Sequence, residues 1–315
     1  MKYIKKFNQH SLYEAYIVGT EFVKPNLSLC VEEDEVHYTQ YIPTPKFLDI
    51  LYSDSNGNLS YTSEILPISK GKTPIALCIA VQDFFGINEK ARWMSLKYMS
   101  CTTPDTGSLT AQGICWGNYG VNIETLKNII KTYQYGQPWG YNTADWITGT
   151  QYKIPSLFDE NNEWNISVLG TVNKYAVTDI DGKNNTNNML TTATAQSDWR
   201  TVSTIDNIGN SNYAPAACCC WRYHTLGTQQ GDWYLGGGGE ITILLAKRNE
   251  INTKLASISL LYSNNCINSL INGEHWTSTE DDSNNVNAFN INTNDGGIGG
   301  NNKGNNKYVI AMLQY

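Results

Sequence analysis

Hydrophobic and polar positions in the first part of the chain alternate in short segments that turn residues separate, a pattern typical of β-hairpins. Residues 27–31 and 35–39 flank an acidic turn and predict one hairpin. Residues 47–52 and 59–65 predict a second, because the Asn-Gly at 56–57 between them supplies the positive φ angles of a tight turn. The start of the chain is therefore predicted to be rich in β-hairpins.

The pattern beyond this region predicts a mixture of strands and helices. Residues 75–81 form an apolar, β-rich run that predicts a strand, and residues 91–96 predict its partner. Capping residues and apolar residues at helical spacing predict helices at 12–18, 122–133 and 240–258. The Ala- and Cys-rich segment 213–223, with Pro215 in its first turn, predicts a buried helix. Further strands are predicted at 276–280, 287–292 and 308–313. The expected fold class is α+β, with antiparallel sheets, two or more helices and long loops.

A proline-bounded stretch divides the chain in two. Pro67 and Pro74 enclose residues that are typical of a linker. We therefore expect an N-terminal domain at residues 1–66 that contains the hairpins. A larger domain is expected at residues 67–315.

Composition and charge narrow the classes of function. The chain has 315 residues, 41% of them hydrophobic and only 16% charged, so it can form a sizeable core beneath a weakly charged surface. A net charge of -7 and a pI near 5.1 argue against general nucleic-acid binding, which depends on clustered Lys and Arg. No apolar run is long enough for membrane insertion. The lysines at positions 2, 5 and 6 precede the largely polar residues 7–11, so no secretory signal is predicted and folding in a cytosol is expected.

The eight cysteines predict buried thiols rather than a metal site or a disulfide framework. No pair has C-x-x-C spacing, and the triplet at 218–220 does not fit a tetrahedral zinc site. Most of the cysteines have apolar neighbours, as small buried hydrophobic residues do. We expect free thiols, no metal and no cofactor.

Two further motifs have a chemical and a structural interpretation. The glycines at 236–239 before Glu240 resemble a phosphate-binding loop, but they lack a following Lys-Ser/Thr, so a loop that enters a packed helix is favoured. The acids at 280–282 could supply calcium ligands, but consecutive acids more often form a solvated turn.

No catalytic motif is evident from the sequence. The four histidines lie in no nucleophile motif, and a glycosidase carboxylate pair stays an open alternative.

Aromatic and amide side chains provide the candidate binding residues. Arg222 and Tyr223 belong to an aromatic-rich cluster that could stack on sugar rings or anchor a protein, or could instead end a helix in the core. Asparagines recur around the predicted strand at 287–292, and alternating residues of a strand share a face. The candidate ligand-binding residues are Arg222, Tyr223, Asn285, Asn287, Asn290, Asn292 and Asn302.

The motifs at 181–186, 213–217, 231–235 and 276–280 together resemble those of C-type-lectin-like modules found in phage and bacterial surface proteins. The likeness spans roughly residues 74–315 and implies a rigid core that carries variable loops. The calcium-ligand motifs of calcium-dependent lectins are absent, so the resemblance does not imply calcium-mediated sugar binding. Residues 7–38 resemble leader segments of virion proteins from tailed phages of gut Bacteroidales.

This resemblance implies a non-enzymatic structural protein of the virion, made and assembled in the host cytoplasm. A head or tail fibre or decoration would attach to other virion proteins through residues 1–66 and bind a host-surface glycan or protein through residues 67–315. We expect a homo-oligomer whose avidity strengthens binding. The alternatives are a bacterial adhesin, a purely architectural virion protein, or an oxidase related to formylglycine-generating enzymes. The oxidase is disfavoured because Cys266 has no cysteine near it in the C-terminal region.

Overall fold

The computed structural model describes residues 28–32, 35–39, 44–81, 90–123, 179–193, 199–281, 285–293 and 298–315. Contacts divide the chain into two units, Met1–Thr44 and Pro45–Tyr315. In the first unit, β1 (Ser28–Glu32) and β2 (Glu35–Thr39) pair as an antiparallel hairpin, as predicted. The predicted helices at 12–18 and, beyond its first two residues, 122–133 lie outside the described residues.

The second unit contains the remaining described elements. Its strands are β3 (Ile50–Asp54), β4 (Leu59–Thr62), β5 (Lys72–Ala80), β6 (Arg92–Tyr98), β7 (Ile114–Cys115), β8 (Trp233–Leu235), β9 (Glu274–Glu280), β10 (Asn287–Asn292), β11 (Ile298–Asn302), β12 (Asn306–Lys307) and β13 (Ile310–Gln314). Its helices are the 3-10 turn η2 (Ile68–Lys70), α4 (Gly182–Thr192), α5 (Pro215–Arg222), α6 (Gly238–Ala246) and α7 (Arg248–Leu261). The paired strands are antiparallel, so the α+β class is confirmed.

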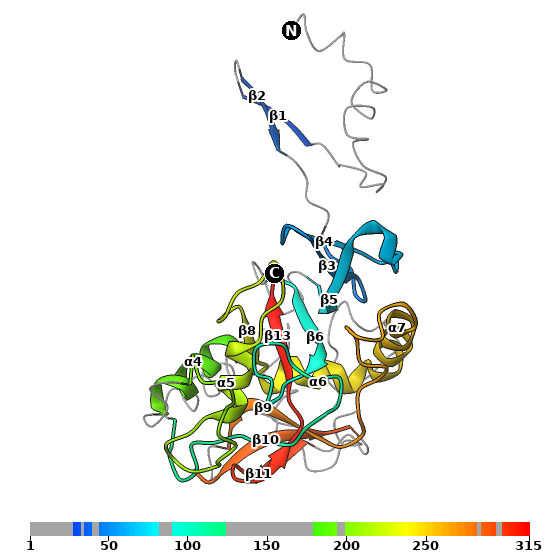
Figure 1. The fold of residues 1–315 in the computed structure, drawn as a ribbon. Helices are drawn as coiled ribbons and strands as arrows, with labels where there is room; N and C mark the ends of the chain where they lie inside the picture. Colours follow the sequence, from blue (N-terminus) through cyan, green and yellow to red (C-terminus); the bar gives the residue numbers. More distant parts are fainter. Residues whose placement is uncertain are drawn as a thin grey trace, which may run out of the picture. The chain divides into compact units, whose positions relative to one another are not determined.

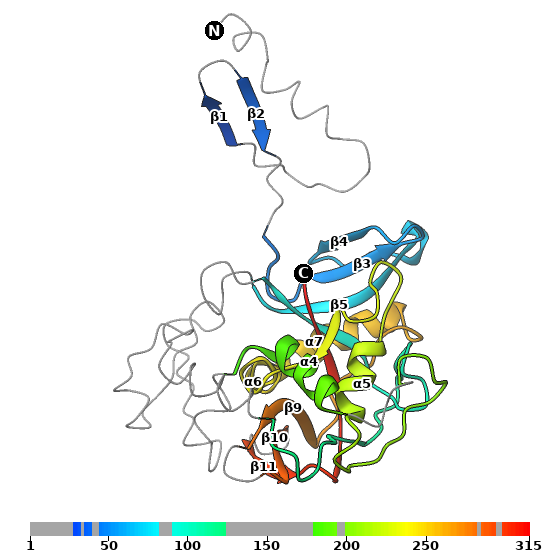
Figure 2. The same ribbon diagram turned by 90° about the vertical axis from the view of Figure 1, so that its left-hand side faces the viewer.

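A six-stranded sheet forms the centre of this unit, in the order β4-β3-β5-β6-β13-β8. The last strand of the chain, β13, lies between β6 and β8, which come from much earlier segments (Figure 1). Strand β3 lies beside β5, and β4 lies beside β3 as an edge strand of the sheet (Figure 2). The sheet therefore joins the first and the last residues of the unit.

The predicted domain boundary between residues 66 and 67 differs from the contact boundary between Thr44 and Pro45. The second predicted hairpin forms β3 and β4 with Gly57 at a φ of 82°, but β3 also pairs with β5. This pairing buries Ile50 and Tyr52 completely, which a solitary hairpin could not do. The second hairpin therefore belongs to the larger unit.

Both faces of the six-stranded sheet are buried. Leu77 and Ile79 of β5 join a core cluster that includes residues of α6 and α7, whereas Ala76 and Cys78 join a second cluster with residues of α4 and α5. Successive side chains of a strand point to opposite faces, so a strand covered on both sides needs a continuous apolar sequence. The apolar run at 75–81 is therefore explained by two layers of covering helices.

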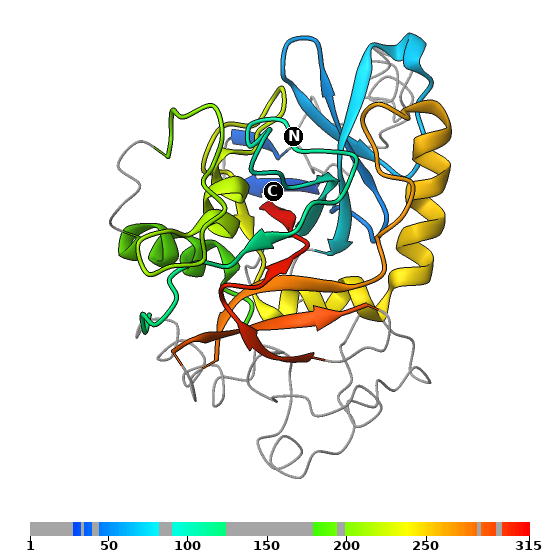
Figure 3. The same cartoon turned by 60° about the horizontal axis from the view of Figure 1, so that its bottom comes forward.

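The predicted helix at 240–258 is two helices, α6 and α7, that meet at Lys247. Figure 3 shows that α6 and α7 run in different directions. The change of direction lets Ile243 of α6 and Leu255 of α7 enter the same core cluster. By contrast, the predicted helix at 213–223 forms as α5, with Pro215 in its first turn.

A smaller three-stranded sheet, in the order β11-β10-β9, lies close to α6 (Figure 3). The short strands β7 and β12 form a separate two-stranded pair. None of the described helices has the length and apolar character needed to cross a bilayer.

We predict that removing residues 310–315 prevents cooperative folding of the second unit. Ile310, Met312 and Leu313 are nearly completely buried, and each large apolar side chain contributes roughly 1.5–3 kcal/mol on burial. Their sum is comparable with the whole stability of a domain. Urea unfolding followed by tryptophan fluorescence should show no cooperative transition for this variant.

A chain that lacks only Tyr315 is the matched control, because that side chain is exposed. It should unfold nearly as the intact protein does. A cooperative transition in the shorter variant would contradict the structural role of β13.

Candidate functional site

Strand β9 carries Trp-Thr-Ser-Thr-Glu at 276–280, and all five side chains are fully buried. The Trp276 indole N–H donates to the Ile114 carbonyl at 2.8 Å, and the Thr279 hydroxyl donates to Asp179 at 2.6 Å. The other three side chains also have hydrogen-bond partners within the protein. This motif therefore holds the fold together and leaves no polar group for a ligand.

The glycine-rich start of α6 uses its backbone N–H groups internally. Gly237, Gly238 and Gly239 are the residues that a phosphate-binding loop would turn toward an anion. Their N–H groups donate to Glu240 Oε2 at 2.8 Å, Thr279 Oγ1 at 2.9 Å and the Asp179 carbonyl at 2.8 Å, respectively. The interpretation as a loop entering a packed helix is therefore confirmed.

Glu240 connects this helix start to the large sheet. Its carboxylate accepts hydrogen bonds from the Arg92 guanidinium at 2.6 Å and from the Tyr234 hydroxyl at 2.8 Å. Arg92 and Glu240 are both almost completely buried. Burial raises the pKa of Glu240, although Arg92 and the hydrogen-bond donors act in the opposite direction.

Asp179 is a second buried carboxylate, placed between α4 and β9. It accepts from the Asn185 amide at 2.7 Å as well as from Thr279. Burial is the largest influence and raises the pKa of Asp179 to about 6 despite these donors. Asp179 thus ties the segment before α4 to the motif in β9.

Glu280 forms a fully buried ion pair with Lys303. The Lys303 ammonium also donates to the Val121 carbonyl at 2.9 Å and lies 4.7 Å from the centre of the Trp116 ring. The prediction that the acids at 280–282 begin a solvated turn is wrong for Glu280, because the strand carries its carboxylate into the interior. No group of three or more His, Cys, Asp or Glu residues in the described segments could hold a metal ion.

Arg222 does not lie on an exposed surface, so this part of the predicted binding site is wrong. Its guanidinium forms a two-pronged ion pair with Asp105, with N–O distances of 2.7 and 2.8 Å. It also donates to the carbonyls of Trp199 and Val202. These contacts involve all three guanidinium nitrogens and join three segments, and Arg222 is only 3% exposed.

Tyr223 is also buried, with 2% of its surface exposed. Its ring packs edge-on against Trp233, with centroids 4.9 Å apart. The prediction of Tyr223 as an exposed stacking residue is therefore wrong. Tyr223 nevertheless lines a cavity beside the strands β3, β5 and β6.

The predicted asparagine set does not share one face of β10. Asn287 lies on the face of Phe289 and Ile291, whereas Asn290 and Asn292 lie on the opposite face. The odd spacing between Asn287 and Asn290 causes this separation. The prediction of one coherent asparagine surface is wrong for this reason.

Asn290 is buried and its amide donates to Glu274 Oε1 at 2.9 Å. Glu274 also pairs with Lys307, so Asn290 belongs to a local polar network. This role differs from the predicted one, because an amide held by a carboxylate is not available to a partner.

Two of the predicted asparagines share one face of the small sheet and a third lies in the turn before it; of these, Asn302 accepts a hydrogen bond from the Gly304 N–H at 2.9 Å through its side-chain oxygen. Asn287 and Asn302 lie opposite each other across β10 and β11, and both are partly exposed. Asn285 is exposed in the turn before β10, where its amide donates to the Gly120 carbonyl at 3.0 Å. We call Asn285, Asn287 and Asn302 the amide surface.

The sequence interpretation missed Lys97, which lines a cavity in the described part of the chain. Lys97 is a charged residue within the otherwise mostly buried strand β6. A charge in the sequence Trp-Met-Ser-Leu-Lys-Tyr was the signal that could have indicated it.

The seven described cysteine side chains are free and buried, in agreement with the predicted thiols. Burial raises the pKa of Cys266 to about 12 and also raises the pKa values of Cys218, Cys219 and Cys220. Since the thiolate is the reactive form, these residues lack the environment of a nucleophile.

Comparison of this chain with protein-family models, curated proteins and solved structures finds no match.

We predict that Glu280→Gln and Lys303→Met each destabilise the protein by about 3–5 kcal/mol, because each leaves one buried charge without its partner. The double variant should be clearly more stable than the sum of the single effects implies. Denaturant unfolding of all four proteins measures this coupling. Additive losses would contradict a direct interaction between the two charges.

His275 generates a prediction for the pH dependence of stability. The ring is buried, its Nε2 has no partner among the described residues, and burial lowers the pKa to about 4 from 6.5. Between these pH values the unfolded chain binds a proton that the folded chain does not, so this contribution to stability falls as pH falls from about 6.5 to 4.

We therefore predict that the wild type loses up to about 3 kcal/mol more stability than His275→Gln between pH 7 and pH 4. Asp179 contributes the opposite slope, since its raised pKa makes the folded chain bind more protons, but this slope is common to both proteins. Urea unfolding at several pH values provides the measurement. Parallel pH profiles would show that His275 is not neutral in the folded protein.

Proposed function

We propose that this chain is a structural protein of a bacteriophage particle, a head or tail fibre or decoration, that binds the host surface without catalysis. One observation carries the proposal: the polar residues of the motif at 276–280 are all buried and bonded, while the amide surface beside them is at least partly exposed. A stiff interior that supports uncharged side chains suits recognition by many hydrogen bonds.

The order of elements supports a C-type-lectin-like assignment for the second unit. The short strand β8 leads through glycines into α6, and β9 with its buried Trp and Glu follows. Strand β13 then returns beside β6 and β8. This order corresponds to the one that the motif resemblance implies.

The environment of the thiols supports a non-enzymatic role. An oxidase of the formylglycine-generating kind would use reactive cysteines, whereas Cys266 is buried and has a raised pKa. A protonated thiol without a second cysteine in its chain neighbourhood is a poor nucleophile.

The N-terminal unit would attach the protein to other virion proteins. Because β3 and β4 belong to the large sheet, we assign this role to residues 1–44 instead of residues 1–66. Many attached copies would raise the avidity of a weak individual contact.

We predict that replacing Asn285, Asn287 and Asn302 together by Ala lowers binding to susceptible Bacteroidales cells about tenfold or more. Amide hydrogen bonds contribute roughly 0.5–1.5 kcal/mol each, so three lost contacts suffice for this change. Binding of a fluorescently labelled protein to a panel of strains measures the effect.

The matched control replaces Asn184, Asn187 and Asn249, which are exposed on α4 and α7, by Ala. This control should bind as the wild type does. Equal binding by both triple variants would exclude the amide surface. Absence of binding to every strain, together with incorporation into purified particles, would favour a purely architectural virion protein.

A further inference from the structure

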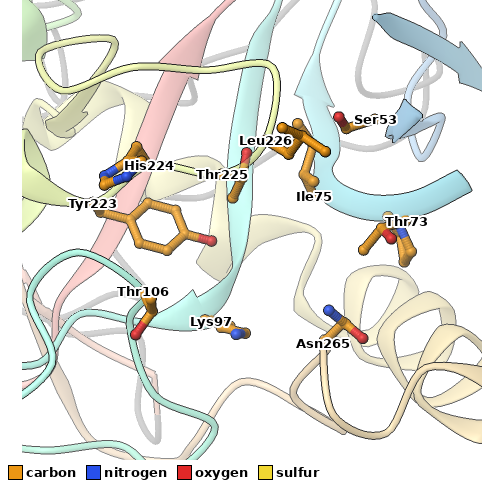
Figure 4. A pocket seen from close by; sticks show the side chains of 11 residues that line it. Ser53, Thr73, Ile75, Lys97, Thr106, Tyr223, His224, Thr225, Leu226 and Asn265 are labelled. Carbon is orange, nitrogen blue, oxygen red and sulfur yellow. The ribbon is translucent and has the colours of Figure 1, made fainter. Parts of the chain in front are cut away.

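A cavity of about 330 Å³ lies where the loop after α5 faces the strands β3, β5 and β6 (Figure 4). Its volume is at the lower end of the range of roughly 300–1,000 Å³ that small-molecule sites occupy. Its lining includes Ile75, Lys97, Thr106, Tyr223, Leu226 and Asn265. None of them belongs to the amide surface.

Lys97 places a positive charge in this cavity. Its neighbours Leu96 and Tyr98 belong to the core on one face of the sheet, so Lys97 projects from the other face. No described residue forms a hydrogen bond or an ion pair with its ammonium, and none of the lining residues has a carboxylate. Partial burial lowers the pKa of Lys97, so an anion beside it would relieve an electrostatic penalty.

Tyr223 places a second polar group in the same cavity. Packing against Trp233 holds its ring, and its backbone N–H donates to the Cys219 carbonyl at 3.1 Å. Its hydroxyl has no hydrogen-bond partner among the described residues, and Figure 4 shows the hydroxyl pointing into the cavity. A phenol that is buried to this extent ordinarily has a partner, so the open hydroxyl indicates a place for a ligand acceptor.

The remaining lining residues define the rest of the ligand. Thr106, Thr225 and Asn265 supply hydroxyl and amide groups, whereas Ile75 and Leu226 form an apolar wall. One ammonium balances one negative charge, which fits a carboxylate better than a doubly charged phosphate. The lining is otherwise largely apolar, so these hydroxyl and amide groups fit the hydroxyl groups of a sugar ring beside that carboxylate, and the apolar wall fits its C–H face.

We infer that this cavity binds a sugar carboxylate, with Lys97 as the counter-ion, Tyr223 as a hydrogen-bond donor and the hydroxyl-bearing residues against the sugar ring. The ligand is a uronic acid, either free or as a unit of an acidic polysaccharide. This inference goes beyond the proposed function, because the cavity would bind a uronic acid whether or not the protein is part of a phage particle.

The test is an NMR titration of the full-length protein with glucuronate, glucose and acetate. Glucose lacks the carboxylate, and acetate lacks the sugar ring. Glucuronate should bind at least about tenfold more tightly than either. A glucuronate-containing oligosaccharide should bind more tightly still if the natural source is a polysaccharide, and no better than glucuronate if the source is the free sugar acid.

Two variants assign the binding to this cavity. Lys97→Met removes the charge but keeps an unbranched side chain of similar length, and it should abolish the preference for glucuronate over glucose. Tyr223→Phe removes one oxygen atom and should weaken glucuronate binding about tenfold, the loss expected for a hydrogen bond to a charged group. Lys183→Met, at a similarly half-buried lysine of α4 outside the cavity, should bind as the wild type does.

Equal affinity for glucuronate and glucose would overturn the inference, and so would unchanged binding by Tyr223→Phe. If Lys97→Met does not fold, as judged by near-ultraviolet circular dichroism, Tyr223→Phe and the comparison of sugars still decide. Cell binding by the Asn variants is measured separately, so failure of the cavity and failure of the amide surface give different results.

Discussion

The central position of β13 is the constraint on which the rest of the second unit depends. This strand provides pairing edges to both β6 and β8, and its side chains enter the core on both faces of the sheet. An interior strand exposes no edge of its own, but the strands beside it would each expose one without it. The unit therefore acquires its complete sheet only when the last residues are in place.

Buried carboxylates connect the loops and helices to this sheet. Asp179, Glu240 and Glu280 each receive donors from segments that are distant in the sequence. A carboxylate in the interior is stable only with such partners, so each one specifies where its segments lie. The low charge content of the chain makes these few ionic contacts more selective, because few alternative partners exist.

The polar chemistry that the fold leaves accessible lies at its periphery. The amide surface lies on the β10–β11 pair and in the turn before it, and the cavity around Lys97 and Tyr223 lies between a loop and the large sheet. Both are supported by rigid strands, which hold side chains in place for recognition without a large loss of conformational entropy. This arrangement separates the residues that stabilise the protein from those that can meet a partner.

The sequence alone determined the features that depend on neighbouring residues. The turn with a positive φ at Gly57, although not at Asn56, the start of α5 at Pro215 and the strand within 75–81 are encoded within a few positions. Which charges meet depends on the packing of distant segments, because Arg222 and Asp105 are separated by 117 positions. The same packing joins the second hairpin to the large sheet and places Lys97 at an open cavity. Such outcomes depend on distant segments packing together, and local patterns of polarity contain no information about that pairing.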